Sequence, residues 1–295
     1  MIKVLTTLIN GLSLGGVYAL IALGYTMVYG IAKMLNFAHG DIIMVGSYTI
    51  LIFFNMIGIP LVGLIASTLI SVLVCVVFGI FIERTAYRPL RGASPLAVLI
   101  TAIGVSYLLQ SIAQIVFGTA PRTVILNFMG TITIGALKIN VATIVTLVVA
   151  FAVMAALTVF VNKTRTGRAM LAVSEDRGAA QLAGVSVNTI IAVTFAIGSA
   201  LAAIAGAFTV MKTYTVEPTM GAMPGIKAFT AAVIGGIGSI PGAMAGGILL
   251  GIIETVCDAI PALSPYKIAI EFALLIIVLL IKPTGILGKK KREKV

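Results

Sequence analysis

The sequence has little charge. Only 10% of its 295 residues are Asp, Glu, Lys or Arg, whereas 60% are hydrophobic and the mean hydropathy is +1.18. Soluble domains carry nearer ~25% charged residues, and a soluble chain of this length could not bury so much apolar surface. The composition therefore excludes a soluble globular protein and predicts a chain surrounded mostly by lipid.

Residue types that carry chemistry are also scarce. His39 is the only histidine, so neither a histidine-based triad nor a histidine-containing metal cluster can be assembled. Cys75 and Cys257 lie in apolar runs without a CxxC partner, and we expect them to be small core residues. No G-x-x-x-x-G-K-[ST] motif is present. The sequence thus predicts no enzyme, no metal site and no cofactor bound by this chain, ATP included.

Long uncharged runs, in contrast, are abundant. A membrane-spanning helix needs about 20 apolar residues. Runs that satisfy this are 4–32, two spans within 42–82 that turn at Pro60 after Gly58, 96–117, 141–161 and 190–211, and a last, shorter span fits 267–281. The glycine-rich stretch 226–258 fits two short helices broken near Gly238–Gly242. The sequence predicts an all-α polytopic membrane protein of eight or nine transmembrane helices, in a single domain over residues 1–295.

Basic residues flank the apolar runs and predict the orientation. They gather at Lys33, in 84–91, in 163–177 and in the tail 282–295. Cytoplasmic loops carry the excess of Lys and Arg, so nine spans place all four sites in the cytoplasm, with the N-terminus outside and the C-terminus inside. Eight spans would move one site to the other side, and we favour nine. On the outer side, residues 118–140 alternate polar and β-branched residues at 122–125 and 131–134, which favours a small hairpin.

One polar segment interrupts the apolar pattern. Residues 163–188 read KTRTGRAMLAVSEDRGAAQLAGVSVN, a composition unsuited to lipid, and we expect a cytoplasmic helix that a partner grips. Gly178-Ala179-Ala180 followed by Gly184 has the spacing of the loop by which ABC importer permeases dock onto their ATPase, and an ordinary charged loop is the alternative. The candidate coupling residues are Arg165, Gly167, Arg168, Glu175, Asp176, Ala179, Ala180 and Gly184.

Two further segments are candidates for the solute pathway. Asn36 is placed to cap the next helix, with Asp41 in its first turn, so the segment is either a helix break beside the pathway or a polar cytoplasmic turn. Residues 232–251 contain GxxxG spacings at 238–242, 242–246 and 247–251, and Pro241 is expected to break or kink the helix, which favours close packing first and a pore-lining or hinge role second. The candidate pathway residues are Asn36, His39, Gly40, Asp41, Gly235, Gly238, Pro241 and Gly242.

Four ionisable residues, Glu254, Asp258, Lys267 and Glu271, lie near the ends of apolar runs. We expect them to reach the outer interface or to pair, for instance Lys267 with Glu271 at i,i+4. An ion-coupled carrier needs buried ionisable groups, and the sequence places none firmly in mid-span. An ion-coupled secondary amino-acid carrier is therefore the alternative rather than the leading hypothesis.

Motifs along nearly the whole chain resemble the branched-chain amino-acid permease family of bacterial ABC importers, the LivH type. In order, they are GLSLGGVYALIALGYTMVYG at 11–30, NFAHG at 36–40, ERTAYRPLR at 83–91, KAFTAAVIGGIGSIPGA at 227–243 and PTGILG at 283–288. The resemblance implies a permease of the type II-like importer fold in the bacterial inner membrane, which forms the translocation pathway for a branched-chain or related amino acid.

The same resemblance implies partners. They are a homologous second permease of the LivM type, two cytoplasmic ATPase subunits that bind the ATP, and a periplasmic or extracellular substrate-binding protein, with no nucleic acid. Relatives of this architecture serve other amino acids, amides and urea, so the substrate stays open, as does a heterodimeric against a homodimeric core. A membrane-embedded enzyme or scaffold is a third hypothesis, for which the sequence offers no reactive cluster.

Overall fold

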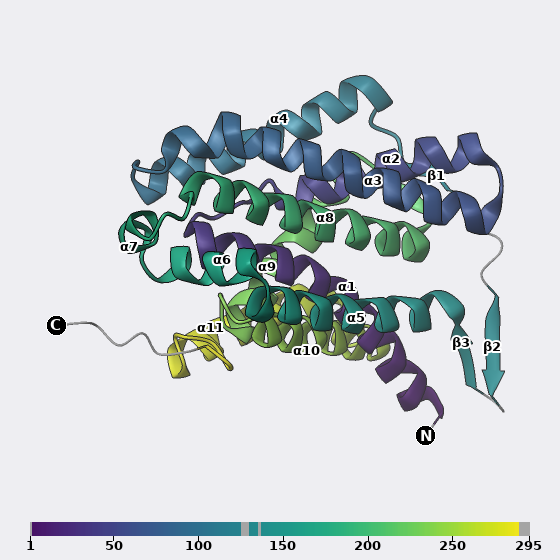
Figure 1. The fold of residues 1–295 in the computed structure, drawn as a ribbon. Coiled ribbons are helices and arrows are strands. Elements are labelled where there is room, and N and C mark those ends of the chain that lie inside the picture. Colours follow the sequence, from purple (N-terminus) through teal and green to yellow (C-terminus); the bar gives the residue numbers. More distant parts are fainter. Residues whose placement is uncertain (1, 125–129, 135–136, 289–295) are drawn as a thin grey trace.

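The computed structural model describes residues 2–124, 130–134 and 137–288 and is a bundle of helices (Figure 1). Within these residues, 8 helices are long and apolar enough to cross a membrane. They are α1 (Ile2–Ala32), α2 (His39–Ile57), α3 (Pro60–Ile82), α4 (Pro95–Phe117), α5 (Val141–Lys163), α8 (Val187–Thr213), α10 (Ile240–Ala259) and α11 (Lys267–Ile281). A shorter apolar helix, α9 (Ala222–Gly235), lies between α8 and α10. The all-α polytopic prediction is confirmed.

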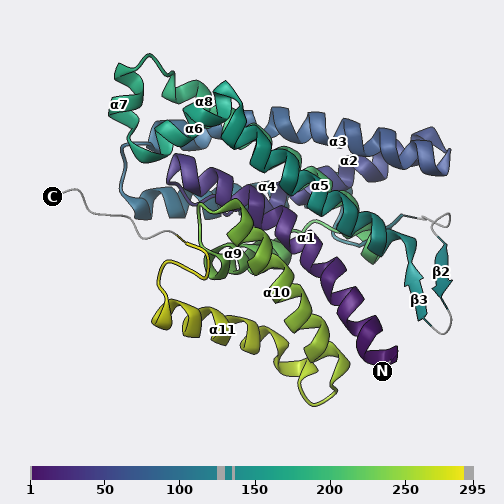
Figure 2. The same cartoon turned by 60° about the horizontal axis from the view of Figure 1, so that its bottom comes forward.

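The position of α9 bears on the number of passes. Figures 1 and 2 show α1 starting at one end of the bundle and α11 finishing at the other, the end that also carries α6 (Arg165–Glu175) and α7 (Arg177–Leu182). A chain that starts and finishes at opposite ends crosses the bundle an odd number of times. The 8 long helices and α9 together satisfy this, in agreement with the nine-span prediction.

Short elements join the helices at the two ends. They are η1 (Glu83–Tyr87), η2 (Arg88–Leu90), η3 (Ser264–Tyr266), β1 (Arg122–Thr123), β2 (Thr131–Ile134), β3 (Leu137–Asn140) and β4 (Thr215–Val216). The predicted hairpin is confirmed in β2 and β3, which pair antiparallel, whereas β1 pairs with β4. Because β1 follows α4 and β4 follows α8, this ladder ties those two helices together. Residues 125–129 and 135–136 of the predicted hairpin segment lie outside the described residues.

Local sequence signals explain where the helices begin and end. Gly58 ends α2 with a φ of 70°, which favours glycine, and Pro60 begins α3, where a missing backbone N–H costs nothing, so the predicted turn is confirmed. Ser94 caps α4 by accepting a hydrogen bond from the Ala97 N–H, and Asn140 caps α5 in the same way from Ala142.

Small residues hold the centre of the bundle together. The most extensive helix–helix contact is between α1 and α10, where Gly247 lies against Ala19 and Gly251 against Gly15. A Cβ added at Gly251 would lie 2.1 Å from the Gly15 nitrogen, so the two backbones touch. In lipid, where apolar burial gives helices little mutual attraction, such close approach supplies the packing energy. The close-packing interpretation of the 247–251 spacing agrees with this contact.

The break in the glycine-rich stretch falls between α9 and α10, at residues 236–239. Pro241 lies in the first turn of α10, so it starts this helix and does not kink it. Gly238 lies in the connecting loop with a φ of 94°, so the 238–242 spacing does not form a helix face. Gly242 instead lies against Gly235, which closes α10 onto α9. The predicted break is confirmed, with Pro241 at the start of the helix that follows it, and the expected helix face at 238–242 is wrong.

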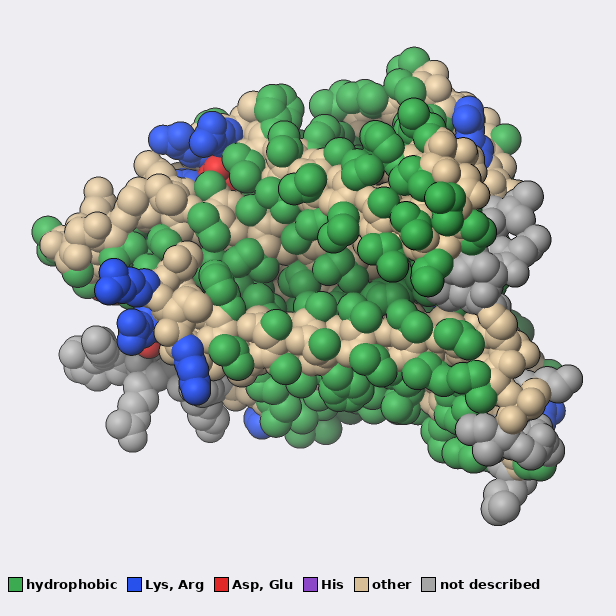
Figure 3. Space-filling view, turned by 45° about the vertical axis from the view of Figure 1, so that its right-hand side comes forward, with side chains coloured by type: hydrophobic (Ala, Val, Ile, Leu, Met, Phe, Trp, Pro, Cys, Tyr) green, Lys and Arg blue, Asp and Glu red, His purple; other side chains and the backbone are tan. Residues whose placement is uncertain are grey.

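The outside of the bundle is apolar. Figure 3 shows hydrophobic side chains covering one face between ends that carry the Lys and Arg side chains. Large exposed apolar residues include Leu69, Leu73 and Val77 on α3 and Ile276 and Ile277 on α11. Such a band matches a hydrocarbon environment. Inside it, both cysteines are free and buried, as predicted.

Candidate functional site

The candidate coupling segment projects from the bundle as two helices, where the sequence predicted one. Thr164 caps α6 by accepting a hydrogen bond from the Gly167 N–H. Asp176 then adopts an extended conformation, with a φ of −151°, and its carboxylate accepts a hydrogen bond from the Ala179 N–H, which caps α7. A residue that caps a new helix cannot continue the previous one. Asp176 therefore divides the segment.

The end of α7 is a Schellman turn that requires glycine. Gly184 has a φ of 82°, the Val185 N–H donates to the Ala180 carbonyl at 2.9 Å, and the Gly184 N–H donates to the Gln181 carbonyl at 3.0 Å. A side chain is disfavoured at such a φ. Gly184 therefore lets the chain turn at the end of this short helix.

The candidate coupling residues divide by burial. Gly167 is buried against the end of α5, where an added Cβ would lie 2.3 Å from the Phe160 carbonyl oxygen. Ala180 lies on the buried face of α7. These two therefore pack within the chain and present nothing to a partner. The other six are exposed: Arg165, Arg168, Glu175, Asp176, Ala179 and Gly184.

Sequence reasoning missed one exposed residue on α7. Leu182 is 93% exposed at the end of the helix, and it shares a face with Ala179 because residues three apart are neighbours on a helix. The signal was available, since Leu182 is a large apolar residue in a polar segment. We call the exposed face formed by Ala179 and Leu182 the α7 tip.

Two arginines anchor the segment to the membrane helices. The Arg177 guanidinium donates a hydrogen bond to the Ala32 carbonyl at the end of α1. Arg91 forms an ion pair with Glu83 and donates a hydrogen bond to Asn188, near the start of α8. Burial, with a smaller contribution from the neighbouring Arg91, lowers the pKa of Arg177. Arg177 thus links the start of α7 to the end of α1.

The predicted helix break between α1 and α2 is buried. The exposed fractions of Asn36, His39 and Asp41 are 2%, 1% and 1%, so this segment is not an exposed polar turn. The expected cap is wrong: Ala38 occupies the N-cap position, and Asn36 Oδ1 accepts a hydrogen bond from the Tyr87 hydroxyl at 2.8 Å. The hydrogen bond from Tyr87 occupies the Asn36 side chain, which therefore does not cap α2.

The start of α2 is enclosed by other parts of the chain. Asp41 lies in its first turn, as predicted, and accepts a hydrogen bond from Gln110 of α4 at 2.9 Å. His39 packs edge-on against Tyr25, with 4.7 Å between ring centroids. An added Cβ at Gly40 would lie 2.4 Å from the Gly221 carbonyl oxygen. The backbone at Gly40 is therefore covered by the segment that leads into α9.

A cluster of buried charges joins four helices. Lys227 of α9 forms ion pairs with Glu254 of α10 at 2.7 Å and with Glu271 of α11 at 3.2 Å, and the Tyr18 hydroxyl of α1 donates to Glu254 at 2.6 Å. The exposed fractions are 5%, 7% and 1% for Lys227, Glu254 and Glu271. We call Tyr18, Lys227, Glu254 and Glu271 the ionic cluster. Buried charges persist where they are paired, and losing one partner is costly.

The expectation that Glu254, Asp258, Lys267 and Glu271 either reach the outer interface or pair is confirmed in its second form, because all four lie in ion pairs. The example pair is wrong, since the buried Glu271 pairs with Lys227 instead of Lys267. Lys267 pairs with Asp258 at 3.0 Å and with Glu254 at 3.6 Å. Sequence reasoning missed Lys227 as a charge partner, although a lone lysine between apolar runs was the available signal.

Comparison with known proteins decides the family. Residues 7–279 match the family described as "Branched-chain amino acid transport system / permease component". The chain belongs to this family. The permease is 45% identical to the high-affinity branched-chain amino acid transport system permease protein BraD of Pseudomonas aeruginosa, over 99% of this chain and 98% of the relative. It is 44% identical to LivH of Escherichia coli strain K12, over 99% of this chain and 97% of the relative.

Family membership sets the class of the molecule. The permease is a multi-pass membrane protein of an ABC importer and not an enzyme, and permeases of this kind operate with partner components. Among solved structures, PsaBC from Streptococcus pneumoniae in complex with Fab aligns with a TM-score of 0.42 and 15% identity, over 96% of this chain and 91% of that chain.

Proposed function

We propose that the permease carries branched-chain amino acids, or closely related ones, across the bacterial inner membrane. The observation that supports this most strongly is similarity along the full length: two permeases for branched-chain amino acids are 45% and 44% identical over 99% of this chain. The ionic cluster would also suit an ion-coupled carrier, but membership in an ABC importer family argues against a carrier that works alone.

The partners follow from the division of labour in such an importer. A second permease of the LivM type completes the membrane core, two ATPase subunits lie on the cytoplasmic side, and an external binding protein delivers the amino acid. We assign the end with α6 and α7 to the cytoplasm because Lys163, Arg165, Arg168 and Arg177 gather there. The start of α1 then faces outward and the basic tail 282–295 inward.

Coupling would proceed through α7. The α7 tip seats in a groove of the ATPase, and closure of the two ATPases around ATP displaces the segment. Arg177 passes this displacement to α1, which packs on α10, so the helices around the pathway tilt. Such a switch requires the ATPases to bind the outward- and inward-facing states with different affinity.

Two measurements test the proposal. Tagged permease is purified in mild detergent and its partners are identified by mass spectrometry, with P-loop ATPases and a second permease expected. The complex is then reconstituted with its binding protein in proteoliposomes. Uptake of radiolabelled leucine is measured with and without ATP on the side of the membrane that carries the ATPase subunits. ATP-dependent uptake supports the proposal, whereas uptake by the chain alone, driven by an ion gradient, would overturn it.

A further inference from the structure

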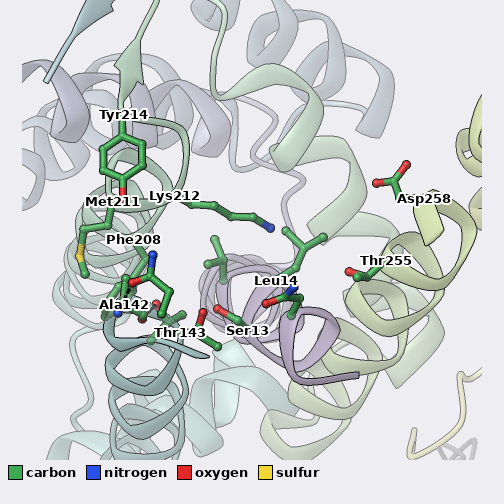
Figure 4. A pocket seen from close by; sticks show the side chains of 14 residues that line it. Ser13, Leu14, Ala142, Thr143, Phe208, Met211, Lys212, Tyr214, Thr255 and Asp258 are labelled. Carbon is green, nitrogen blue, oxygen red and sulfur yellow. Dashed lines mark hydrogen bonds between the residues drawn. The ribbon is translucent and has the colours of Figure 1, made fainter. Parts of the chain in front are cut away.

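A cavity of about 380 Å³ opens beside the start of α5 (Figure 4), which lies at the end of the bundle opposite α7 (Figure 1). Four helices form its walls: α1 contributes Ser13 and Leu14, α5 contributes Thr143, and the last turns of α8 and α10 complete it. Its volume is in the range of small-molecule sites. The cavity lies within this chain, and neither the candidate pathway residues nor the coupling segment line it.

The cavity carries one charge of each sign. Figure 4 shows Lys212 reaching in from α8 and Asp258 on the far side, on α10. Within the described part of the chain, Lys212 makes no hydrogen bond or ion pair, although it lies in the electrostatic field of Glu254 and Asp258. Lys212 therefore has capacity for an anion. Asp258 already accepts from Lys267 through both carboxylate oxygens, at 3.0 Å each, and from the Ser264 hydroxyl at 3.2 Å. A carboxylate has about four acceptor positions, so Asp258 retains capacity for a cation.

The rest of the lining supplies both acceptors and apolar surface. Thr146 and Thr255 donate their hydroxyl protons to carbonyls of their own helices, at 2.8 Å each, so their free lone pairs act as acceptors. Leu14, Phe208 and Met211 add apolar surface to the lining. A ligand that fits this lining has a carboxylate, an ammonium group and an apolar side chain.

We propose that this cavity binds the amino acid itself, as a zwitterion, on the outer side of the membrane. The ligand carboxylate pairs with Lys212, its ammonium group pairs with Asp258 and the threonine oxygens, and its side chain rests on Leu14, Phe208 and Met211. The inference rests on the proposed function, since it takes an amino acid as the transported solute, and it places a contact with that solute inside one permease subunit.

Direct binding tests this assignment. The intact complex is purified without the binding protein, and equilibrium binding of radiolabelled L-leucine is measured. We expect Lys212→Met and Asp258→Asn each to weaken binding at least about tenfold, because each removes a charge-assisted contact, and Lys212→Arg to restore it in part. Lys3→Met and Glu217→Gln, which remove charges at the same end but outside the cavity, leave binding unchanged. 4-Methylpentanoate and 3-methylbutylamine, with one charge each, compete at least about tenfold less well than leucine.

The outcomes separate this inference from the proposed function. Unchanged leucine binding in Lys212→Met and Asp258→Asn, or no binding to the wild-type complex, would overturn the cavity as a solute site, while ATP-dependent leucine uptake by wild type would leave the importer assignment standing. Failure of wild type to take up any amino acid, with its partners present, would overturn the importer and the cavity site together. Elution of each variant as an intact complex shows that lost binding is not lost folding.

Discussion

The α1–α10 contact and the α6–α7 segment both depend on glycine, for opposite physical reasons. At the contact, Gly15 and Gly251 are needed because they have no side chain, and two backbones meet where a Cβ would lie. In the segment, Gly184 is needed for its φ of 82°, and nothing lies within 4 Å of the position its Cβ would take. Gly15 and Gly251 allow α1 and α10 to pack closely, whereas Gly184 shapes the exposed turn at the end of α7. Sequence spacing alone does not distinguish them.

The sharpest way to test this difference is to add a side chain at the contact. We expect Gly251→Leu to prevent accumulation of the folded permease, because the new atoms overlap the backbone of Gly15. Membrane-inserted protein is measured by immunoblot and by elution in detergent. The matched control is Gly104→Leu on α4, where no atom lies within 4 Å and normal accumulation is expected. Equal yields of both variants would contradict the close-contact account.

The ionic cluster should give the next largest effect. Lys227→Met leaves Glu254 and Glu271 buried without their shared partner, and we expect a loss of about 3–5 kcal/mol in stability, as for other broken buried pairs. Thermal unfolding in detergent measures it. Adding Glu254→Gln and Glu271→Gln should recover part of the loss, since the uncompensated charges are gone. Lys3→Met, on the exposed start of α1, is the control and should unfold like wild type.

A smaller effect is expected at Gly184. In Gly184→Ala the added Cβ meets no other atom, but it sits on a left-handed backbone, which costs about 1–2 kcal/mol. We expect this cost to be confined to the end of α7. The permease should accumulate and unfold normally, while hydrogen exchange at the Gly184 and Val185 amides, which close the turn, should quicken. Unchanged exchange in this turn would show that glycine is not required there.

The smallest effect on the fold, and the largest on transport, is expected at the α7 tip. Leu182→Asp changes a side chain that is 93% exposed, so its stability should be within about 0.5 kcal/mol of wild type. ATP-dependent leucine uptake should be lost because the apolar contact with the ATPase is replaced by a charge. Thr189→Asp, an exposed residue beyond the turn, serves as the control. Normal uptake in Leu182→Asp would remove the α7 tip from the coupling surface.

Much of the fold was predictable because a lipid environment makes helix length and charge decisive. The spans, the turn at Gly58 and Pro60, and the break before Pro241 follow from uncharged runs and from the backbone limits of glycine and proline. The charged pairs did not follow. Lys227 and Glu271 are 44 positions apart, so their contact depends on how α9 and α11 pack, which periodicity does not specify.

The site was predictable in part for the same reason. The exposed coupling segment was visible as a polar interruption, but its division at Asp176 and the burial of Ala180 depend on tertiary contacts. Asn36 shows the limit most clearly. Asn36 is a good capping residue near a helix start, but its side chain accepts a hydrogen bond from Tyr87, 51 positions away, and Ala38 occupies the N-cap position instead. Local preference gives way where a distant partner satisfies the same group.

The central claim, that the α7 tip is where ATP hydrolysis is coupled to transport, is tested most directly by a cross-link. Both native cysteines are buried, so Leu182→Cys introduces an exposed thiol on the tip. The purified complex is treated with a short reagent that has a thiol-reactive group at one end and a photoactivatable group at the other, so that no cysteine is needed on the ATPase. The account predicts a permease–ATPase product whose yield changes when ATP is added, and no such product from Thr189→Cys. An intact complex in which Leu182→Cys forms no product with the ATPase, in either nucleotide state, would contradict it.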